Sequence, residues 1–327
     1  MAKLVAAFGS SHSPALASPA EDMAGHARRD QQYLHHLDRD GNRVTYEELL
    51  RQALPGVDIS PQTIKERVAA CERHLDRLSH SIMNARLDAL IVVGDDQREQ
   101  YFEDNMPAFL VYCGASIANS TLQLPAEAPE YWKRARSVYH EPDAPREYPV
   151  ARELGLHLVG FLLDSEFDVA FSEKLAKPRG EGHAFGFVHR RLLAQNVVPI
   201  VPLVVNTYYP PNQPRPRRCF RLGLAVRKAV ASFAEESRIG ILASGGFSHF
   251  TIDEALDLAV LAACESGNED ALASIPLAKL NSGSSEIRNW IVMAGAAAGM
   301  RMAWREYVPL YRTPAGTGCG MAFAAWS

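Results

Sequence analysis

The stretch Leu87–Gln97 (LDALIVVGDDQ) places an apolar run directly before a glycine and three polar residues. A run of this length without polar alternation is typical of a strand that is covered on both faces of a sheet. Three further runs have the same form and also end at small or polar residues: Leu4–Phe8, Val197–Val205 and Ile239–Ala243. Together, the four runs predict the central strands of a sheet.

Segments with helical periodicity lie between these runs. Apolar residues recur every three or four positions over residues 64–82, and shorter stripes of the same period cover 222–233 and 256–263. Helices that alternate with buried strands predict an α/β fold, with a central, mostly parallel or mixed sheet flanked by helices. No repeat or composition shift divides the chain, so we expect a single domain over residues 1–327.

A polar insertion at about residues 18–61 follows the first predicted strand and fits this pattern least well. Long insertions of this kind either cover a functional site or elaborate the surface. Both interpretations suit the composition equally. In the first interpretation the insertion lies near the active site.

Charge and composition exclude several classes of protein. The 327 residues include 34 Lys+Arg and 38 Asp+Glu, a formal charge of −4, which argues against nucleic acid as a partner. No apolar run reaches the roughly 20 residues of a membrane helix, and residues 1–9 do not resemble a signal peptide. The five cysteines are widely spaced and form no CxxC pair. We therefore expect reduced thiols, a cytoplasmic location and no membrane partner.

Polar residues that directly follow apolar runs are the first candidates for a site, because ligands of open α/β sheets bind beyond the carboxyl ends of the strands. They are His12, Asp95–Gln97, Asn206 and His249. A histidine at a strand end and a later carboxylate could hold a metal, as in the two-histidine, one-carboxylate sites of Fe(II) oxygenases. A structural role is the alternative at each position.

Two further candidates have less specific surroundings. His183 lies in a glycine-rich loop, GEGHAFGF, that could bring it into a pocket. Glu254 is a possible metal ligand, but it also matches a capping box with Thr251 as N-cap. By that motif alone, the structural role of Glu254 is at least as well supported.

Several of these stretches, taken in order along nearly the whole chain, resemble the class III extradiol ring-cleavage dioxygenases, the superfamily of the protocatechuate 4,5-dioxygenase catalytic subunit. The matching stretches are Ser10–Leu16, Leu90–Asp96, Pro107–Phe109, Val205–Pro211, Arg218–Gly223, Ser244–His249 and Ser282–Ser284 with Trp290. The Gly-Asp-Asp-Gln run and the early insertion look most like the 3-O-methylgallate dioxygenase branch.

The resemblance implies an oxidoreductase that uses Fe(II) and O2 to open the ring of a catechol or gallate derivative beside its diol. His12 matches the first iron ligand, and Glu254 matches the carboxylate ligand. His183 matches the catalytic acid/base, and His249 matches a histidine of the catalytic pocket. The implied partners are a small aromatic diol and O2.

Two positions depart from the family pattern. Gln97 stands where better-known members have a second iron-binding histidine, so the second ligand is Gln97, Asp96 or a histidine of the insertion (His26, His35 or His36). Tyr148 stands where the protocatechuate enzyme has a substrate-contacting histidine. We expect Tyr148, Asn206 and Ser284 to contact the substrate.

Two alternatives to the oxygenase remain. A zinc-dependent hydrolase on the same scaffold is favoured by Gln97, because an amide ligates iron more weakly than an imidazole. A non-catalytic relative that binds aromatics is the other. For the assembly we expect a homodimer, the usual state of soluble enzymes, without the separate small subunit of the protocatechuate enzyme.

Overall fold

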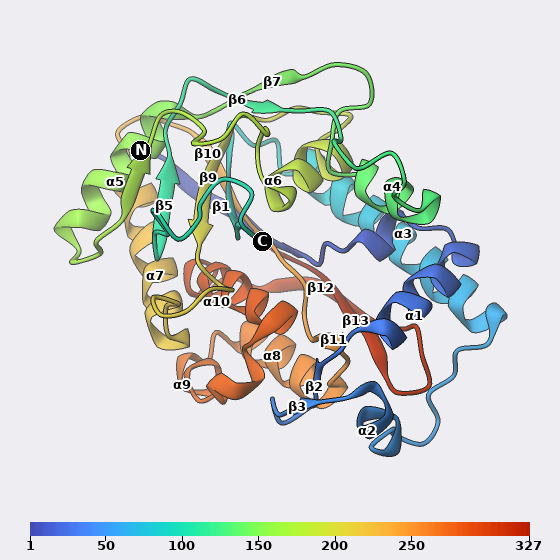
Figure 1. Cartoon of the computed structure of the whole chain (residues 1–327). Coiled ribbons are helices and arrows are strands. Elements are labelled where there is room, and N and C mark those ends of the chain that lie inside the picture. Colours follow the sequence, from blue (N-terminus) through green and yellow to red (C-terminus); the bar gives the residue numbers. More distant parts are fainter.

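A nine-stranded mixed sheet forms the centre of the computed structural model, which describes residues 1–327 (Figure 1). Its strand order is β11-β13-β1-β10-β4-β9-β5-β8, and β12 pairs with β13. The sheet strands are β1 (Lys3–Ser10), β4 (Ala89–Gly94), β5 (Phe109–Tyr112), β8 (Ala170–Ser172), β9 (Ile200–Val205), β10 (Arg238–Ser244), β11 (His249–Thr251), β12 (Met302–Tyr311) and β13 (Thr317–Trp326). Two small hairpins pair β2 (His36–Leu37) with β3 (Arg43–Val44), and β6 (Ser116–Asn119) with β7 (Arg146–Pro149).

Helices connect and cover the strands. The α-helices are α1 (Met23–Gln32), α2 (Tyr46–Arg51), α3 (Pro61–Asn84), α4 (Glu130–Ser137), α5 (Arg152–Asp164), α6 (His183–Phe187), α7 (Pro216–Ser232), α8 (Glu254–Ser266), α9 (Glu269–Ala273) and α10 (Ile287–Ala296). Shorter helical turns are η1 (Pro14–Ala17), η2 (Ala20–Asp22), η3 (Val188–Leu192), η4 (Leu277–Lys279) and η5 (Ser282–Glu286). The expected α/β class, with a mixed sheet flanked by helices, is confirmed.

Both faces of the sheet are buried, as the continuous apolar runs predict. Along β4, Leu90 and Val92 pack into one core cluster, whereas Ile91 and Val93 pack into another. The first cluster includes α3, and the second includes α5, α7 and α10, so these helices cover opposite faces (Figure 1). Strands β1, β10, β4 and β9 are parallel, which brings their carboxyl ends to one edge.

The C-terminal hairpin β12–β13 is the main element that the sequence did not predict. Every residue of β13 is buried, and this strand lies between β12 on one side and β1 and β11 on the other. Its sequence, TGCGMAFAAW, is rich in small residues and lacks the β-branched run of the other central strands. The hairpin also contacts the N-terminal insertion.

The insertion (residues 18–61) contains η2, α1, the β2–β3 hairpin and α2. Asp30 on α1 accepts hydrogen bonds from the Arg312 guanidinium at 2.8 and 3.2 Å and from the Thr317 hydroxyl at 2.7 Å. A second pair joins Asp22 to Arg134 of α4, with contacts of 2.8 and 2.6 Å. Buried and partly buried ion pairs therefore fix α1 against the rest of the fold.

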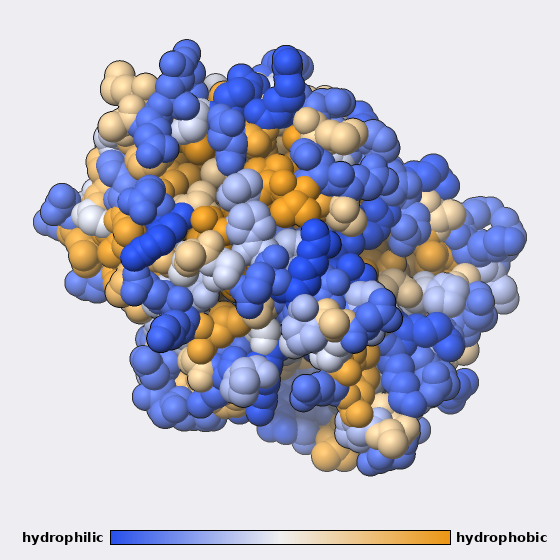
Figure 2. All heavy atoms as spheres, turned by 90° about the horizontal axis from the view of Figure 1, so that it is seen from above, coloured by the Kyte–Doolittle hydropathy of each residue, from blue (hydrophilic) through white to orange (hydrophobic).

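The cysteine thiols lie in the interior, and the surface seen in Figure 2 is largely polar. All five cysteines are buried and free. Hydrophilic residues cover most of the face seen in Figure 2, and hydrophobic side chains show there in separate patches. Among the helices, none combines the length and the apolar character needed to cross a bilayer.

Candidate active site

Four buried side chains meet beyond the carboxyl ends of the parallel strands. His12 follows β1, Asp95 follows β4, His183 begins α6, and Glu286 ends η5. Each offers one atom suited to a metal, and these atoms all lie within 4.8 Å of one another. The edge of the sheet therefore brings together two imidazoles and two carboxylates from distant parts of the chain.

The hydrogen bonds of His12 fix which ring nitrogen carries the proton. Its Nδ1 lies 3.0 Å from the hydroxyl of Ser244, and that hydroxyl donates to the carbonyl of Ala184 at 2.7 Å. Since the hydroxyl proton is used there, Nδ1–H must donate to Ser244. Burial lowers the pKa of His12 to about 3, so the ring is neutral. Its Nε2 lone pair is buried, has no hydrogen-bond partner and lies 3.4 Å from Glu286.

Glu286 lies among hydrogen-bond donors. Its carboxylate accepts from the backbone N–H of Gly246 at 2.5 Å and from the amide of Gln97 at 2.9 Å. His249 lies 3.5 Å away on another side. Burial opposes ionisation of Glu286, but the pairing with His249 and the charge of His183 outweigh it and lower the pKa of the carboxyl group. Glu286 is thus a carboxylate, the state required of a metal ligand.

Asp95 behaves differently from Glu286. Burial, with the neighbouring Glu286 charge, raises the pKa of Asp95 well above its usual range. Its Oδ1 accepts a hydrogen bond from Asn289 at 3.1 Å. Two adjacent buried carboxyl groups cannot both ionise cheaply, so Asp95 retains the proton and Glu286 carries the charge.

His183 is held by a carboxylate that the sequence analysis did not single out, Glu99. The His183 Nδ1 lies 2.7 Å from Glu99 Oε2, and the His183 backbone N–H lies 3.1 Å from both Glu99 oxygens. Burial lowers the pKa of His183, but this pairing outweighs it and raises the pKa to about 9. The signal for Glu99 was its position two residues after Gln97, in the same strand-end loop.

Glu254 does not join this cluster, which corrects the expectation that it meets His12. Its carboxylate accepts a hydrogen bond from the Tyr311 hydroxyl at 2.6 Å, at the first residue of α8. The expected capping box is also absent, since Asp253 is the N-cap and accepts from the Leu256 N–H at 3.1 Å. The carboxylate of the cluster is Glu286, 32 residues further along the chain (286 − 254).

Tyr148 and Asn206 also lie outside the cluster and its cavity. Tyr148 is buried, donates to Glu141 at 2.5 Å and stacks on His189 with ring centroids 4.0 Å apart. Asn206 bonds to both backbone groups of Tyr209 and to the side chain of Asn212, which orders the loop after β9. Both residues shape the protein near the site instead of facing a ligand.

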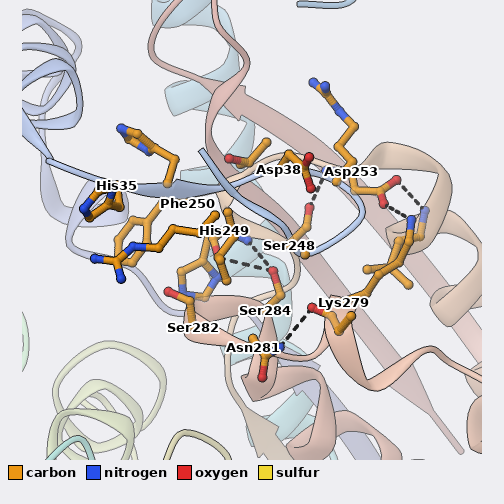
Figure 3. Close-up of a pocket in the computed structure, with 18 of the residues that line it drawn as sticks. His35, Asp38, Ser248, His249, Phe250, Asp253, Lys279, Asn281, Ser282 and Ser284 are labelled. Atoms are coloured by element: carbon orange, nitrogen blue, oxygen red, sulfur yellow. Dashed lines mark hydrogen bonds and ion pairs between the residues drawn. The ribbon is translucent and has the colours of Figure 1, made fainter. Parts of the chain in front are cut away.

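Two adjoining cavities open beside the cluster. The inner cavity, of about 220 Å³, is lined by His12, Gln97, His183, His249 and Glu286, and by aromatic and arginine side chains of the insertion and of α4. The outer cavity, of about 470 Å³, is drawn in Figure 3. Tyr33, Tyr208, His249 and Phe250 line both cavities.

Ser284 belongs to the wall of the outer cavity, beside His249 (Figure 3). Its hydroxyl lies 3.1 Å from the His249 N–H and 3.2 Å from the His249 carbonyl. His249 Nδ1 is 2.7 Å from the carbonyl of Phe247. Ser284 therefore fixes the backbone that presents His249 to both cavities.

A neutral imidazole, a carboxylate and a carboxylate-held histidine beside a cavity form a possible metal site in an α/β fold. Comparison with known proteins identifies the family of this chain: residues 59–322 match the family described as the catalytic LigB subunit of aromatic ring-opening dioxygenase. The chain belongs to this family. The matched part contains Asp95, Gln97, His183 and Glu286, and it begins after His12.

The similar curated proteins are ring-cleaving dioxygenases by name. A 2,3-dihydroxyphenylpropionate/2,3-dihydroxicinnamic acid 1,2-dioxygenase of Azotobacter vinelandii is 27% identical over 195 residues, which cover 60% of this chain and 52% of that protein. The enzyme of the same name from Xanthobacter autotrophicus is 25% identical over 162 residues, 50% of this chain and 44% of that protein. A gallate dioxygenase of Pseudomonas putida is 36% identical over 110 residues, 32% of this chain and 31% of that protein. The chain spans about half the length, or less, of these relatives.

Proposed function

We propose that this chain is a non-haem Fe(II)-dependent extradiol dioxygenase that cleaves the ring of a catechol or gallate derivative with O2. Family membership supports the reaction class. The observation that carries the proposal is the Nε2 atom of His12, a buried acceptor without a partner, 3.4 Å from the Glu286 carboxylate. A buried unpaired acceptor costs free energy, and a bound metal cation would satisfy it.

The residues present fit such a metal. His12 and Glu286 supply an imidazole nitrogen and a carboxylate oxygen, and Gln97 is the third ligand that we propose. The Gln97 amide already lies 2.9 Å from Glu286, and a turn of this amide about its last bond would present Oε1 instead of Nε2.

The other candidates for the third ligand have partners of their own. Asp96 accepts hydrogen bonds from the backbone N–H groups of residues 99–101. His26 lies 2.8 Å from the Ser18 hydroxyl, and His36 lies 2.9 Å from the carbonyl of Asp30. His35 lines the outer cavity and is exposed. These contacts favour Gln97.

Bound at this site, Fe(II) supplies electron transfer between a diol and O2. The acid/base work falls to His183. Because Glu99 engages Nδ1 and raises the pKa of His183 to about 9, the ring rests as an imidazolium, and Nε2–H carries the proton that we propose it donates as a general acid. His249, at the boundary between the two cavities, is the residue that we propose to orient the ring.

Metal content and oxygen uptake test this proposal together. Protein loaded anaerobically with Fe(II) should consume O2 with at least one member of a catechol panel. Glu286→Gln should lose the metal, whereas Glu254→Gln, the matched carboxylate control, should keep both metal and activity. His183→Ala should retain the metal and turn over about 10²–10⁴-fold more slowly. Two results together would contradict the proposal: the wild type consumes no O2 with any catechol, and the Glu286→Gln variant binds as much metal as the wild type.

A zinc-dependent hydrolase is the second candidate, and Gln97 is the observation that favours it. An amide binds iron more weakly than an imidazole does, so Gln97 makes the site less selective for iron. Zinc accepts nitrogen and oxygen ligands of several kinds, and it activates a bound water molecule. Zinc without iron in the purified protein, together with turnover that needs no O2, would favour this candidate over the oxygenase.

The assembly is also a proposal. The insertion contributes His26, Arg29, Asp30 and Tyr33 to the inner cavity, so the chain covers its own site with residues near its N-terminus. We propose that no separate small subunit is required and that the working unit is a homodimer. Activity of the chain expressed alone, with its mass measured by light scattering, tests both statements.

A further inference from the structure

The inner cavity has a cationic wall, defined here as Arg29 of α1 and Arg136 of α4 with the Trp132 ring beside them. The Arg29 guanidinium lies 3.9 Å from the Trp132 ring centroid and 5.5 Å from that of Tyr33. The Arg136 guanidinium lies 6.0 Å from the Trp132 centroid and 5.3 Å from that of Tyr139. Both arginines therefore rest on aromatic rings.

The arginines of the cavity differ in their partners. Arg312 forms two hydrogen bonds to Asp30, so its charge is balanced. Arg29, in contrast, forms no ion pair and no hydrogen bond with the protein. Arg136 approaches a carboxylate only at 3.9 Å, and that carboxylate belongs to Glu99, which already holds His183. The cationic wall thus has N–H donors without protein partners, on side chains that line the cavity.

The chemistry of this wall suits a carboxylate. Guanidinium groups that stack on aromatic rings keep their in-plane N–H donors free and match a carboxylate in two-point geometry. The inner cavity, at about 220 Å³, is small, so an acid group that reaches the wall is attached to the ring directly or through a very short chain. Repulsion from Glu286 would keep such a group away from the metal ligands.

We propose that Arg29 and Arg136 bind the carboxylate of the substrate, which makes the substrate class the ring-carboxylated catechols. This inference rests on the proposed function and adds the substrate specificity of the proposed enzyme. Arg29 precedes residue 59, where the match to the family begins, so it belongs to a segment outside that match. The insertion would then set the substrate preference of this chain.

The outer cavity is the competing place for an acid group, and it is less suited to one. Its Lys279 is paired with Asp253 at 2.8 Å, and its Arg39 donates to the carbonyl of Ile252 at 3.0 Å. Arg43 is exposed on the short strand β3. An acid on a long chain could reach this cavity past Phe250, so chain length separates the two sites experimentally.

Anaerobic calorimetric titration with protocatechuate and its neutral methyl ester tests the proposal without turnover. The Fe(II)-loaded wild type should bind the acid at least about tenfold more tightly than the ester. Arg29→Met and Arg136→Met should each weaken binding of the acid about tenfold and leave binding of the ester unchanged. Arg28→Met, an exposed neighbour on α1, is the matched control and should change neither.

The other outcomes overturn the inference in distinguishable ways. Equal losses for acid and ester in Arg29→Met and Arg136→Met would mean that these residues only shape the wall. Tighter binding of dihydrocaffeate than of protocatechuate, weakened by Arg43→Met, would move the acid site to the outer cavity. Binding of the ester without preference for the acid overturns this inference alone, whereas binding of neither overturns the proposed function as well.

Discussion

Asp30→Ala should lower the free energy of unfolding by about 3–5 kcal/mol, because it leaves a buried guanidinium without its partner. Arg312 is 7% exposed, and Asp30 is 3% exposed. The carboxylate accepts two hydrogen bonds from Arg312 and one from Thr317. Water cannot replace these bonds readily at a buried site, so the loss of one partner costs more than the pair contributes.

Urea denaturation measures this effect, with Glu265→Ala as the matched control. Glu265 pairs with Arg305 at 3.0 Å, and the two side chains are 48% and 41% exposed, so its removal should cost about 1 kcal/mol or less. Arg312→Met combined with Asp30→Ala should recover part of the stability, because no buried charge is left unpaired. Equal losses for Asp30→Ala and Glu265→Ala would refute the reasoning, as would a double variant less stable than Asp30→Ala.

Three further predictions concern the cavity. Burial lowers the pKa of His26 from 6.5 to about 4, so unfolding takes up a proton between these pH values and stability falls as pH drops from 6.5 to 4. The decrease amounts to about 3 kcal/mol, and His26→Gln should flatten it in denaturation curves measured across that range. Gln97→His should tighten metal binding in a chelator competition, because imidazole is the stronger ligand; an unchanged affinity would remove Gln97 from the ligand set. Divalent metal at about 100 times its dissociation constant should stabilise the wild type by about 2.7 kcal/mol in thermal melts, and Glu286→Gln should abolish this gain.

The sequence predicts the central strands well because a strand that is buried on both faces has a continuous run of apolar residues. The runs that contain β1, β4, β9 and β10 are continuous and apolar, and each ends at small or polar residues. Parallel strands carry these ends to one edge, so the sequence predicts that His12 and the 95–97 loop lie at the same edge of the sheet. The hairpin β12–β13 was missed because small residues fill its crowded position without a run of branched side chains.

The carboxylate of the site could not be chosen from local sequence. Glu254 and Glu286 both stand at the beginning of a helix, after a loop that follows the strand region. Only tertiary packing separates them: Glu286 receives the Gly246 N–H at the end of β10, whereas Glu254 turns toward Tyr311 of β12. Glu99 was missed for a related reason, because its partner His183 lies 84 residues away and no spacing rule links the two.

The charges of the inner cavity leave separate places for the proposed metal ion, beside Glu286, and for the arginine guanidinium groups. No Lys or Arg pairs with Glu286, although this carboxylate is only 1% exposed, and its neighbour His12 is kept neutral by burial. The cation beside Glu286 is the His249 imidazole at 3.5 Å, and under our proposal a divalent metal supplies positive charge on the His12 side of this carboxylate. The arginines of the cavity are engaged elsewhere, Arg312 with Asp30 and the other two against Trp132. A substrate with a diol for the metal and a carboxylate for the guanidinium groups would complement both charges, and either group alone would leave one of them unmatched.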